Sequence, residues 1–218
     1  MDQKLVYTFP SRVETSGGAL SLSWAPGENA FAASRTLAHN DALQTVRLRP
    51  AALSAEECAR VIALGEAQPR RDGRVELGAD AYRVSHIAWL EPGPDTHWLY
   101  HKLGALFLEA GRAYGFKLEG FADALQYTVY GEGQHFDWHI DLGPGSTSLR
   151  KLSMTLPLSA EGDYRGGALE FLTVPALPPL HPAGHAIFFP SYLAHRVSPI
   201  LSGTRRSLVA WASGPAFC

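Results

Sequence analysis

The sequence has little cysteine, no excess of either charge and no long apolar run. Its two cysteines, Cys58 and Cys218, are too few for a disulfide framework and lie outside any CxxC metal pattern. Lysine and arginine number 19 against 21 aspartate and glutamate, so no global field attracts nucleic acid or an anionic membrane. No apolar run approaches the roughly 18 residues of a membrane span, and the N-terminus lacks the apolar stretch of a signal peptide. These absences predict a soluble, cytoplasmic protein that binds neither nucleic acid nor membrane.

The composition predicts a globular protein with a substantial core. Of the 218 residues, 46% are hydrophobic and 18% are charged, which is enough apolar material to fold. A chain of this length forms one domain or one domain with an extension. Residues 1–45 carry short apolar runs broken by "SGG" and "PGEN", typical of irregular strands and turns. We therefore predict an N-terminal extension, 1–45, that packs on a core domain formed by residues 46–218.

Two helices and a strand are predicted in the first half of the core domain. Residues 53–68 have Ser54 as an N-cap and Glu57 three residues later, the pattern of a capping box. Residues 95–115 have apolar side chains at helical spacing and end on a glycine. Between these helices, residues 81–91 are rich in β-branched and aromatic side chains and predict a strand.

The second half of the chain has the texture of an all-β structure. Short segments of strand character alternate with turns rich in glycine, proline and serine, at the spacing of a sandwich or barrel. The predicted strands are 123–130, 135–141, 151–158, 168–174, 185–190, 194–199 and 205–213. Two helices before such a half predict an α+β domain in which the helices buttress one sheet.

The stretch "GEGQHFDWHID", residues 131–141, ends on a His-x-Asp pair. In a strand, residues i and i+2 project from the same face, so His139 and Asp141 would present an imidazole and a carboxylate side by side. Together they would make two of the three ligands of a 2-His-1-carboxylate site, which leaves positions open on Fe(II). His195, at the start of a later strand, is the candidate third ligand. The alternative is a solvated strand end, since a lone HxD pair is a weak signal.

Arginines near the C-terminus are candidate anchors for an acid group. Arg205 shares a strand face with Ser207, and a guanidinium can grip a carboxylate through two parallel hydrogen bonds. A surface cation is the alternative, and only one of Arg205 and Arg206 can face inward.

Arg83, with Ser85 on the same strand face, either reaches the mouth of a cavity or forms a structural ion pair.

The motifs of this half, in their order and spacing, resemble those of a known enzyme family. The resemblance covers roughly residues 50–213, and "YRVSHIAWL" (82–90) is similar to a strand that the family has before its second helix. The chain resembles a 2-oxoglutarate- and Fe(II)-dependent dioxygenase of the prolyl 4-hydroxylase-like branch. The motifs that carry this resemblance are Tyr130 nine residues before His139, "YRGGALEF" (164–171), "GHAIFFPS" (184–191), His195, "GTR" (203–205) and Trp211.

The resemblance implies a fold and a set of site residues. The fold is a double-stranded β-helix, a jelly-roll sandwich also seen in cupins. The metal and catalytic ligands are His139, Asp141 and His195. Arg205 would bind the distal carboxylate of 2-oxoglutarate, Tyr130 would contact the same group, and Ser207 and Thr155 are weaker candidates for that pocket. Related halogenases have a small residue in place of the carboxylate ligand, so Asp141 favours hydroxylation. Trp211 we expect in the core.

The resemblance also implies a reaction. Fe(II), 2-oxoglutarate and O₂ would hydroxylate an unactivated C–H bond of an amino acid or amino-acid residue, proline among the candidates, with release of succinate and CO₂. Ascorbate is a candidate reductant, and the partner is an amino acid, a peptide or another small molecule. Two alternatives stay open: oxidation of a different metabolite, and a cupin-like module that holds metal or ligand without oxidising anything. Convergence of the three ligands and Arg205 would favour an enzyme.

Overall fold

The chain divides into two compact units, residues 1–39 and residues 40–218. The structure, a computed structural model, describes residues 5–7, 12–16, 19–23, 25–26, 31–33, 40–73, 75–77, 80–160, 162–174 and 182–216. Among these described residues, no helix is long and apolar enough to cross a membrane.

The first unit consists of short antiparallel strands. β1 (Leu5–Tyr7) pairs with β4 (Phe31–Ala33), and β2 (Arg12–Ser16) pairs with β3 (Ala19–Ser23). Short strands are what the sequence predicts for this region. The packing of this extension on the core domain stays a prediction.

The second unit begins at residue 40, earlier than the predicted boundary at residue 46. The amide of Asn40 donates a hydrogen bond to the carbonyl of Tyr114, at 2.8 Å. The hydroxyl of Tyr192 donates to the carbonyl of Leu43, at 2.7 Å, within the short helix η1 (Asp41–Gln44). These bonds join residues 40–44 to residues far along the sequence, a pairing that local composition does not reveal.

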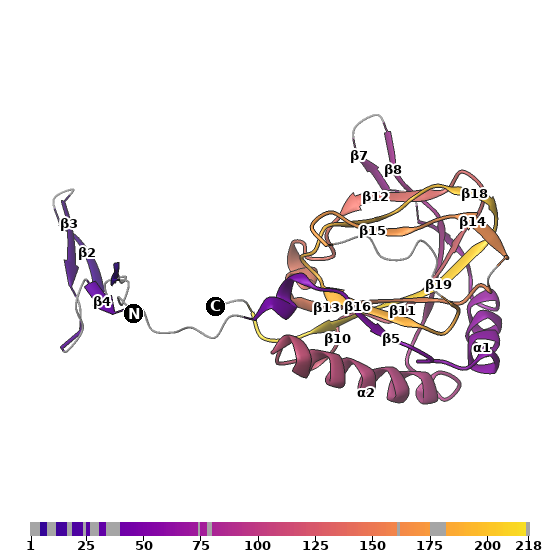
Figure 1. Ribbon diagram of the computed structural model, residues 1–218, viewed down its shortest axis with the longest axis horizontal. Helices are drawn as coiled ribbons and strands as arrows, with labels where there is room; N and C mark the ends of the chain where they lie inside the picture. Colours follow the sequence, from indigo (N-terminus) through magenta and orange to yellow (C-terminus); the bar gives the residue numbers. More distant parts are fainter. Residues whose placement is uncertain are drawn as a thin grey trace. The chain divides into compact units, whose positions relative to one another are not determined.

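Two antiparallel sheets face each other in this unit (Figure 1). The larger sheet has the order β5 (Arg47–Arg49), β16 (Ala186–Pro190), β13 (Arg150–Pro157), β19 (Arg205–Ser213), β11 (Leu125–Tyr130), β9 (His86–Leu90) and β6 (Arg71–Asp72), with β10 (Gly120–Phe121) also on β19. The smaller sheet has the order β15 (Leu169–Phe171), β17 (His195–Val197), β12 (His135–His139), β8 (Asp80–Val84) and β7 (Val75–Leu77). A further pair joins β14 (Tyr164–Gly166) to β18 (Ile200–Gly203), and the short helix η2 (Gly145–Leu149) precedes β13.

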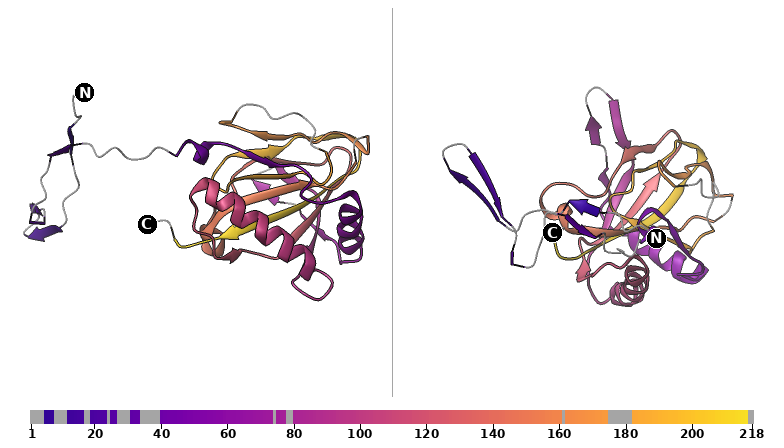
Figure 2. Two further views of the ribbon diagram at one scale, coloured as in Figure 1. Left: turned by 60° about the horizontal axis from the view of Figure 1, so that its bottom comes forward. Right: turned by 60° about the vertical axis from the view of Figure 1, so that its left-hand side comes forward.

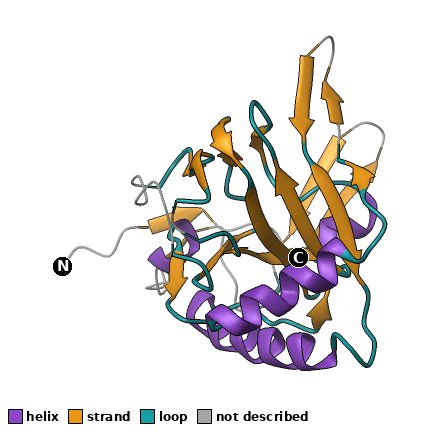
Figure 3. Cartoon of the chain, turned by 90° about the vertical axis from the view of Figure 1, so that its right-hand side faces the viewer, coloured by secondary structure: helices purple, strands orange, loops and turns teal. Residues whose placement is uncertain are grey.

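Two helices cover the outer face of the larger sheet, as the views in Figures 1, 2 and 3 show. α1 (Ala55–Glu66) begins with the predicted capping box, because the Ser54 hydroxyl accepts from the Glu57 N–H and the Glu57 carboxylate accepts from the Ser54 N–H. α2 (His97–Tyr114) ends at Gly115, whose φ of +70° a glycine adopts without strain. Together with the facing sheets, they confirm the predicted α+β fold with a double-stranded β-helix core.

Strand alternation sets the two faces of the larger sheet apart. On β13, Leu152, Met154 and Leu156 are fully buried in the core that includes the helices. Ser153 and Thr155, between them, point to the opposite face, because successive side chains in a strand alternate. The inner face of the sheet therefore carries polar side chains into the space between the sheets.

The predicted strand 81–91 is two strands in different sheets. β8 pairs with β12 of the smaller sheet, whereas β9 pairs with β11 of the larger one. The chain crosses over at Ser85, which is fully buried and whose carbonyl accepts a hydrogen bond from Gly73 N–H at 2.8 Å. This crossing connects β8, the strand next to the edge strand β7 of the smaller sheet, to β9 of the larger sheet.

Candidate metal centre

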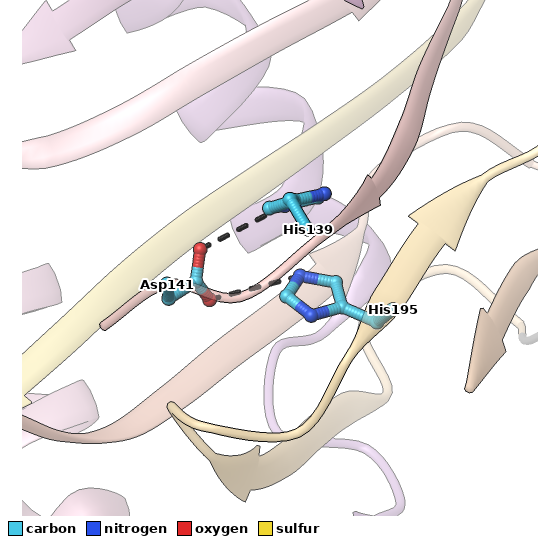
Figure 4. Close-up of side chains that lie close together, drawn as sticks. All are labelled: His139, Asp141 and His195. Carbon is cyan, nitrogen blue, oxygen red and sulfur yellow. Dashed lines mark ion pairs between the residues drawn. The ribbon is translucent and has the colours of Figure 1, made fainter. Parts of the chain in front are cut away.

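Three side chains that are predicted as ligands converge between the two sheets. The candidate ligand atoms of His139, Asp141 and His195 all lie within 4.8 Å of one another. Figure 4 shows the carboxylate facing both imidazoles, with Nε2 of His139 3.8 Å from Oδ1 and Nε2 of His195 3.7 Å from Oδ2. The two histidines lie directly opposite each other where β12 pairs with β17. Their convergence is structural; their role as metal ligands stays a prediction.

Each histidine ring is held by its own backbone. Nδ1 of His139 lies 2.7 Å from the carbonyl oxygen of Asp137, and Nδ1 of His195 lies 2.9 Å from that of Leu193. Because a carbonyl oxygen can only accept, Nδ1 carries the proton in both rings. In the neutral form of each ring Nε2 then carries the lone pair, and it faces Asp141, which is the arrangement that metal-binding histidines use.

Asp141 lies beyond the strand in which the sequence places it. β12 ends at His139, and Asp141 follows in a bend. The N–H of Asp141 donates to the carbonyl of Ser191 at 2.9 Å. The Ser153 hydroxyl donates to Oδ2 of Asp141 at 2.6 Å and lies 2.9 Å from the hydroxyl of Ser191. The carboxylate is therefore oriented by β13 and by the Pro-Ser turn after β16, and not by alternation along β12.

Burial and neighbouring charge fix the protonation of the site. Burial, and then the adjacent His195, lower the pKa of His139 to about 4. Burial acts to raise the pKa of Asp141, but His195, His139 and the Ser153 hydroxyl outweigh it and hold that pKa below its usual value. Near neutral pH the site therefore presents a neutral His139 and an ionised carboxylate, the protonation states that metal ligation requires.

This arrangement fits a cation. The two Nε2 atoms and the carboxylate oxygens carry lone pairs that point at one another, and a separation of 3.7–3.8 Å is too long for a hydrogen bond. Lone pairs facing one another repel unless a positive centre lies among them. Two imidazoles and one carboxylate form the donor set of a non-haem Fe(II) site with open positions.

A cavity of about 50 Å³ extends from these ligands to Arg205. Arg205 is only 3% exposed, and its Nη1 donates to the Ser207 hydroxyl at 3.1 Å. Among the described residues, no acceptor lies within hydrogen-bond reach of its buried Nε. A buried guanidinium without a carboxylate is costly, so the site fits a ligand that brings one.

The remaining predicted site residues line the same cavity. Tyr130 lies beneath Arg205, whose guanidinium carbon is 5.6 Å from the centre of its ring, and Thr155 and Ser207 contribute to the wall. Arg206 faces away and pairs with Glu66 at 3.3 Å, so one arginine of the pair is inward, as predicted. Their contacts with 2-oxoglutarate stay predictions.

The glycine pair of "YRGGALEF" makes room for Arg205. Gly167 has a φ of +63°, and a Cβ there would lie 2.9 Å from Cδ of Arg205 and 2.4 Å from Cδ1 of Ile200. Such distances are shorter than van der Waals contact, so a side chain at Gly167 would displace the arginine.

Sequence reasoning missed several residues of the site. Trp211 is buried as predicted, but it lines the cavity, and its indole N–H has no partner among the described residues. Gln126, in the cavity wall, was not singled out, and neither were Ser153 and Ser191, which hold Asp141. A signal existed for Ser153, which lies two residues before Thr155 on one strand face. For Ser191 the only signal was its place in the Pro-Ser turn.

Comparison with known proteins gives consistent results. Residues 125–213 match the family model of the 2OG-Fe(II) oxygenase superfamily. The chain is 35% identical over 150 residues to a PKHD-type hydroxylase of Hyphomonas neptunium, covering 64% of this chain and 65% of that protein. It is 31% identical over 164 residues to a PKHD-type hydroxylase of Thioalkalivibrio sulfidiphilus, covering 72% of each.

Among solved structures, a prolyl-4-hydroxylase of Pseudomonas putida has a similar fold. The TM-score is 0.60 at 21% identity, covering 78% of this chain and 93% of that one. The chain spans slightly less than two thirds of the length of the Hyphomonas protein.

Proposed function

Because this chain belongs to the 2OG-Fe(II) oxygenase superfamily, in the PKHD-type hydroxylase family, we propose that it is a 2-oxoglutarate-dependent dioxygenase. The proposed reaction is hydroxylation of an unactivated C–H bond of an amino acid or amino-acid residue, with proline as one candidate. One observation carries the proposal: the three ligand side chains and a buried, unsatisfied Arg205 line the same cavity.

The residues of the site have separate tasks in this proposal. His139, Asp141 and His195 would hold Fe(II), each oriented by a hydrogen bond to a carbonyl or hydroxyl. Fe(II) and 2-oxoglutarate would supply the activation of O₂: one oxygen atom enters the C–H bond, and the other enters succinate as the cosubstrate loses CO₂.

Arg205 would bind the distal carboxylate of the cosubstrate. Its guanidinium is fixed by the Ser207 hydroxyl and lies over the ring of Tyr130, so little side-chain freedom is left to lose on binding. Its Nε is a donor already removed from water, and a charge-assisted hydrogen bond is strongest in such a place. A dicarboxylate suits a cavity with an arginine at one end and a metal site at the other.

The apolar part of the cavity wall would keep water from the reaction. Phe136, Leu169, Val197 and Val209 line the cavity together with the polar groups. Such side chains exclude bulk water, which would otherwise compete with the substrate for the oxidant. The substrate in this proposal is an amino acid, a peptide or another small molecule.

An anaerobic titration with Fe(II) and 2-oxoglutarate tests the proposal. We expect a visible charge-transfer band from the chelate in the wild-type protein and a weaker band or none in Asp141→Ala, which lacks one of the three ligands. The matched control is Glu170→Gln, since Glu170 is a carboxylate of the same sheet that pairs with Arg196 at 2.7 Å and lies outside the cavity wall.

The results separate the alternatives. A band in the wild type and in the control that is weaker or absent in Asp141→Ala supports the dioxygenase and justifies a substrate screen by succinate release. Metal binding without a band in the wild type contradicts it and favours a cupin-like binding module. A band with turnover only of compounds unrelated to amino acids would favour oxidation of another metabolite.

A further inference from the structure

Arg83 on β8 is a second arginine in the cavity, and the metal and cosubstrate do not use it. It lines the cavity together with His139, Asp141 and His195. Its Nε donates to the hydroxyl of the fully buried Ser85 at 2.9 Å. The guanidinium is therefore held in place at the crossing between the two sheets.

An aromatic stack connects Arg83 to the metal ligands. Its guanidinium carbon lies 4.8 Å from the centre of the Phe136 ring, in cation–π geometry. Phe136 stacks in turn on the His139 imidazole, with ring centroids 3.5 Å apart and an interplanar angle of 12°. An acid group bound by Arg83 would consequently lie near the reactive centre.

Arg83, like Arg205, has no acidic partner in the described part of the chain, whereas three arginines outside the cavity wall do. Arg150 pairs with Asp123 at 2.5 Å, Arg196 with Glu170 at 2.7 Å and Arg206 with Glu66 at 3.3 Å. Within the described part of the chain, no carboxylate forms an ion pair with Arg83, and Ser85 is the sole hydrogen-bond partner of its guanidinium. Its two terminal nitrogens are thus available to a ligand.

The charges of the proposed complex leave Arg83 in surplus. Fe(II) would offset Asp141 and the metal-proximal carboxylate of 2-oxoglutarate, and Arg205 would offset the distal carboxylate. A half-buried cation beside this neutral set would favour a substrate that carries a negative charge. The planar fork of a guanidinium suits a carboxylate, which it can bind with two parallel hydrogen bonds.

We propose that Arg83 binds a free carboxylate of the substrate. The substrate is then a free amino acid or the C-terminal residue of a peptide, and not an internal residue of a chain. This inference rests on the proposed dioxygenase function and names the substrate class of the same site.

Succinate release from the Fe(II)- and 2-oxoglutarate-loaded protein tests the inference. The probes are the twenty L-amino acids, the same compounds as α-amides, and N-acetyl-glycyl dipeptides that end in each amino acid with a free carboxylate. We expect at least one acid to stimulate release about tenfold or more above its amide, since the amide removes the charge that Arg83 would bind. Stimulation by the free amino acid or by the dipeptide identifies which source of carboxylate the site takes.

Variants separate binding from a structural role of Arg83. In Arg83→Gln we expect KM for the best acid to rise about 10- to 100-fold and the preference for acid over amide to fall towards one. Arg83→Lys, which keeps the charge, should recover part of that preference. The control Arg196→Gln removes a guanidinium from the same sheet outside the cavity wall and should leave KM and the preference unchanged.

Several results would overturn the inference while leaving the dioxygenase intact. These are equal turnover of acid and amide by the wild type, an unchanged preference in Arg83→Gln, or no stimulation by any acid although the chelate band forms. Absence of the chelate band in the wild type is a different failure, because it removes the proposed function itself and this inference with it.

Discussion

The two faces of the larger sheet are equally buried but carry opposite chemistry. On β13, Leu152 and Leu156 belong to the helix-covered core at 0% exposure, whereas Ser153, at 0%, bonds to Asp141 and Thr155, at 6%, lines the cavity. On β19, Leu208 belongs to the same core, whereas Arg205, on the opposite face of the same strand, lines the cavity. A single strand therefore supplies a stabilising face and a chemical face, separated by one residue.

The core face of the larger sheet stabilises the protein, whereas the cavity face lowers its stability. Each core leucine contributes about 1.5–3 kcal/mol by leaving water. The cavity side, by contrast, keeps the Arg205 Nε and the Trp211 indole N–H buried without partners in the described part of the chain, which lowers stability. Unsatisfied donors of this kind are expected where a ligand completes the structure.

The largest effect is expected from an apolar replacement on the cavity face. Arg205→Met should weaken 2-oxoglutarate binding by about 2–5 kcal/mol, because the distal carboxylate loses its charged partner. The thermal stability of the ligand-free protein should stay equal or rise, because a buried charge without a partner is removed. Titration of the chelate band and calorimetric unfolding measure the two quantities.

The neighbouring arginine gives the matched control for that variant. Arg206 lies on the helix-covered side of the sheet, and Arg206→Met removes only a half-exposed ion pair with Glu66. The affinity for 2-oxoglutarate should therefore not change. Equal loss of cosubstrate affinity in both variants, or marked destabilisation by Arg205→Met alone, would break the distinction between the two faces.

A truncation on the core face should give the reverse result. Leu156→Ala creates a cavity in a fully buried cluster and should lower the free energy of unfolding by about 2–5 kcal/mol. At a temperature where the variant stays folded, the chelate band should form at wild-type concentrations of Fe(II) and 2-oxoglutarate. Denaturant unfolding gives the first quantity, and a loss of cosubstrate affinity would show that the faces are coupled.

The smallest effect should come from a hydroxyl that orients a ligand. Ser153→Ala removes the hydrogen bond to Oδ2 of Asp141 and should weaken Fe(II) binding by about 10- to 100-fold. Ser159→Ala is the control, because that serine is also buried but bonds to the backbone of Thr204 and Arg206. A competition assay with a colorimetric chelator measures both, and wild-type affinity in Ser153→Ala would contradict the role given to this hydroxyl.

The sequence predicted most of the larger sheet because its strands are regular. β19 occupies residues 205–213 as predicted, and alternation alone places Arg205 and Ser207 on one face and Arg206 on the other. The capping box at Ser54 was equally readable, because both of its partners are local. Features with a local physical cause were predictable.

The errors arise where distant segments decide the backbone. The segment 81–91 keeps its β pattern through Ser85, so nothing local reveals that the chain changes sheets there. Likewise, β12 ends at His139 because the N–H of Asp141 bonds to Ser191, fifty residues away. The three side chains that converge were identified as candidate ligands from residue types and spacing, but the residues that orient them depend on contacts that the sequence does not show.

One consequence follows from the way the two histidines are tethered. Each imidazole proton goes to the carbonyl two residues earlier in its own strand or turn, so the aim of each ring is set by local folding. The two imidazoles are therefore already ordered once the sheet has formed. Binding of a metal would then cost little further side-chain conformational entropy. In the proposed metal site, the apoprotein would be a preformed receptor, with both imidazoles already aimed before Fe(II) binds.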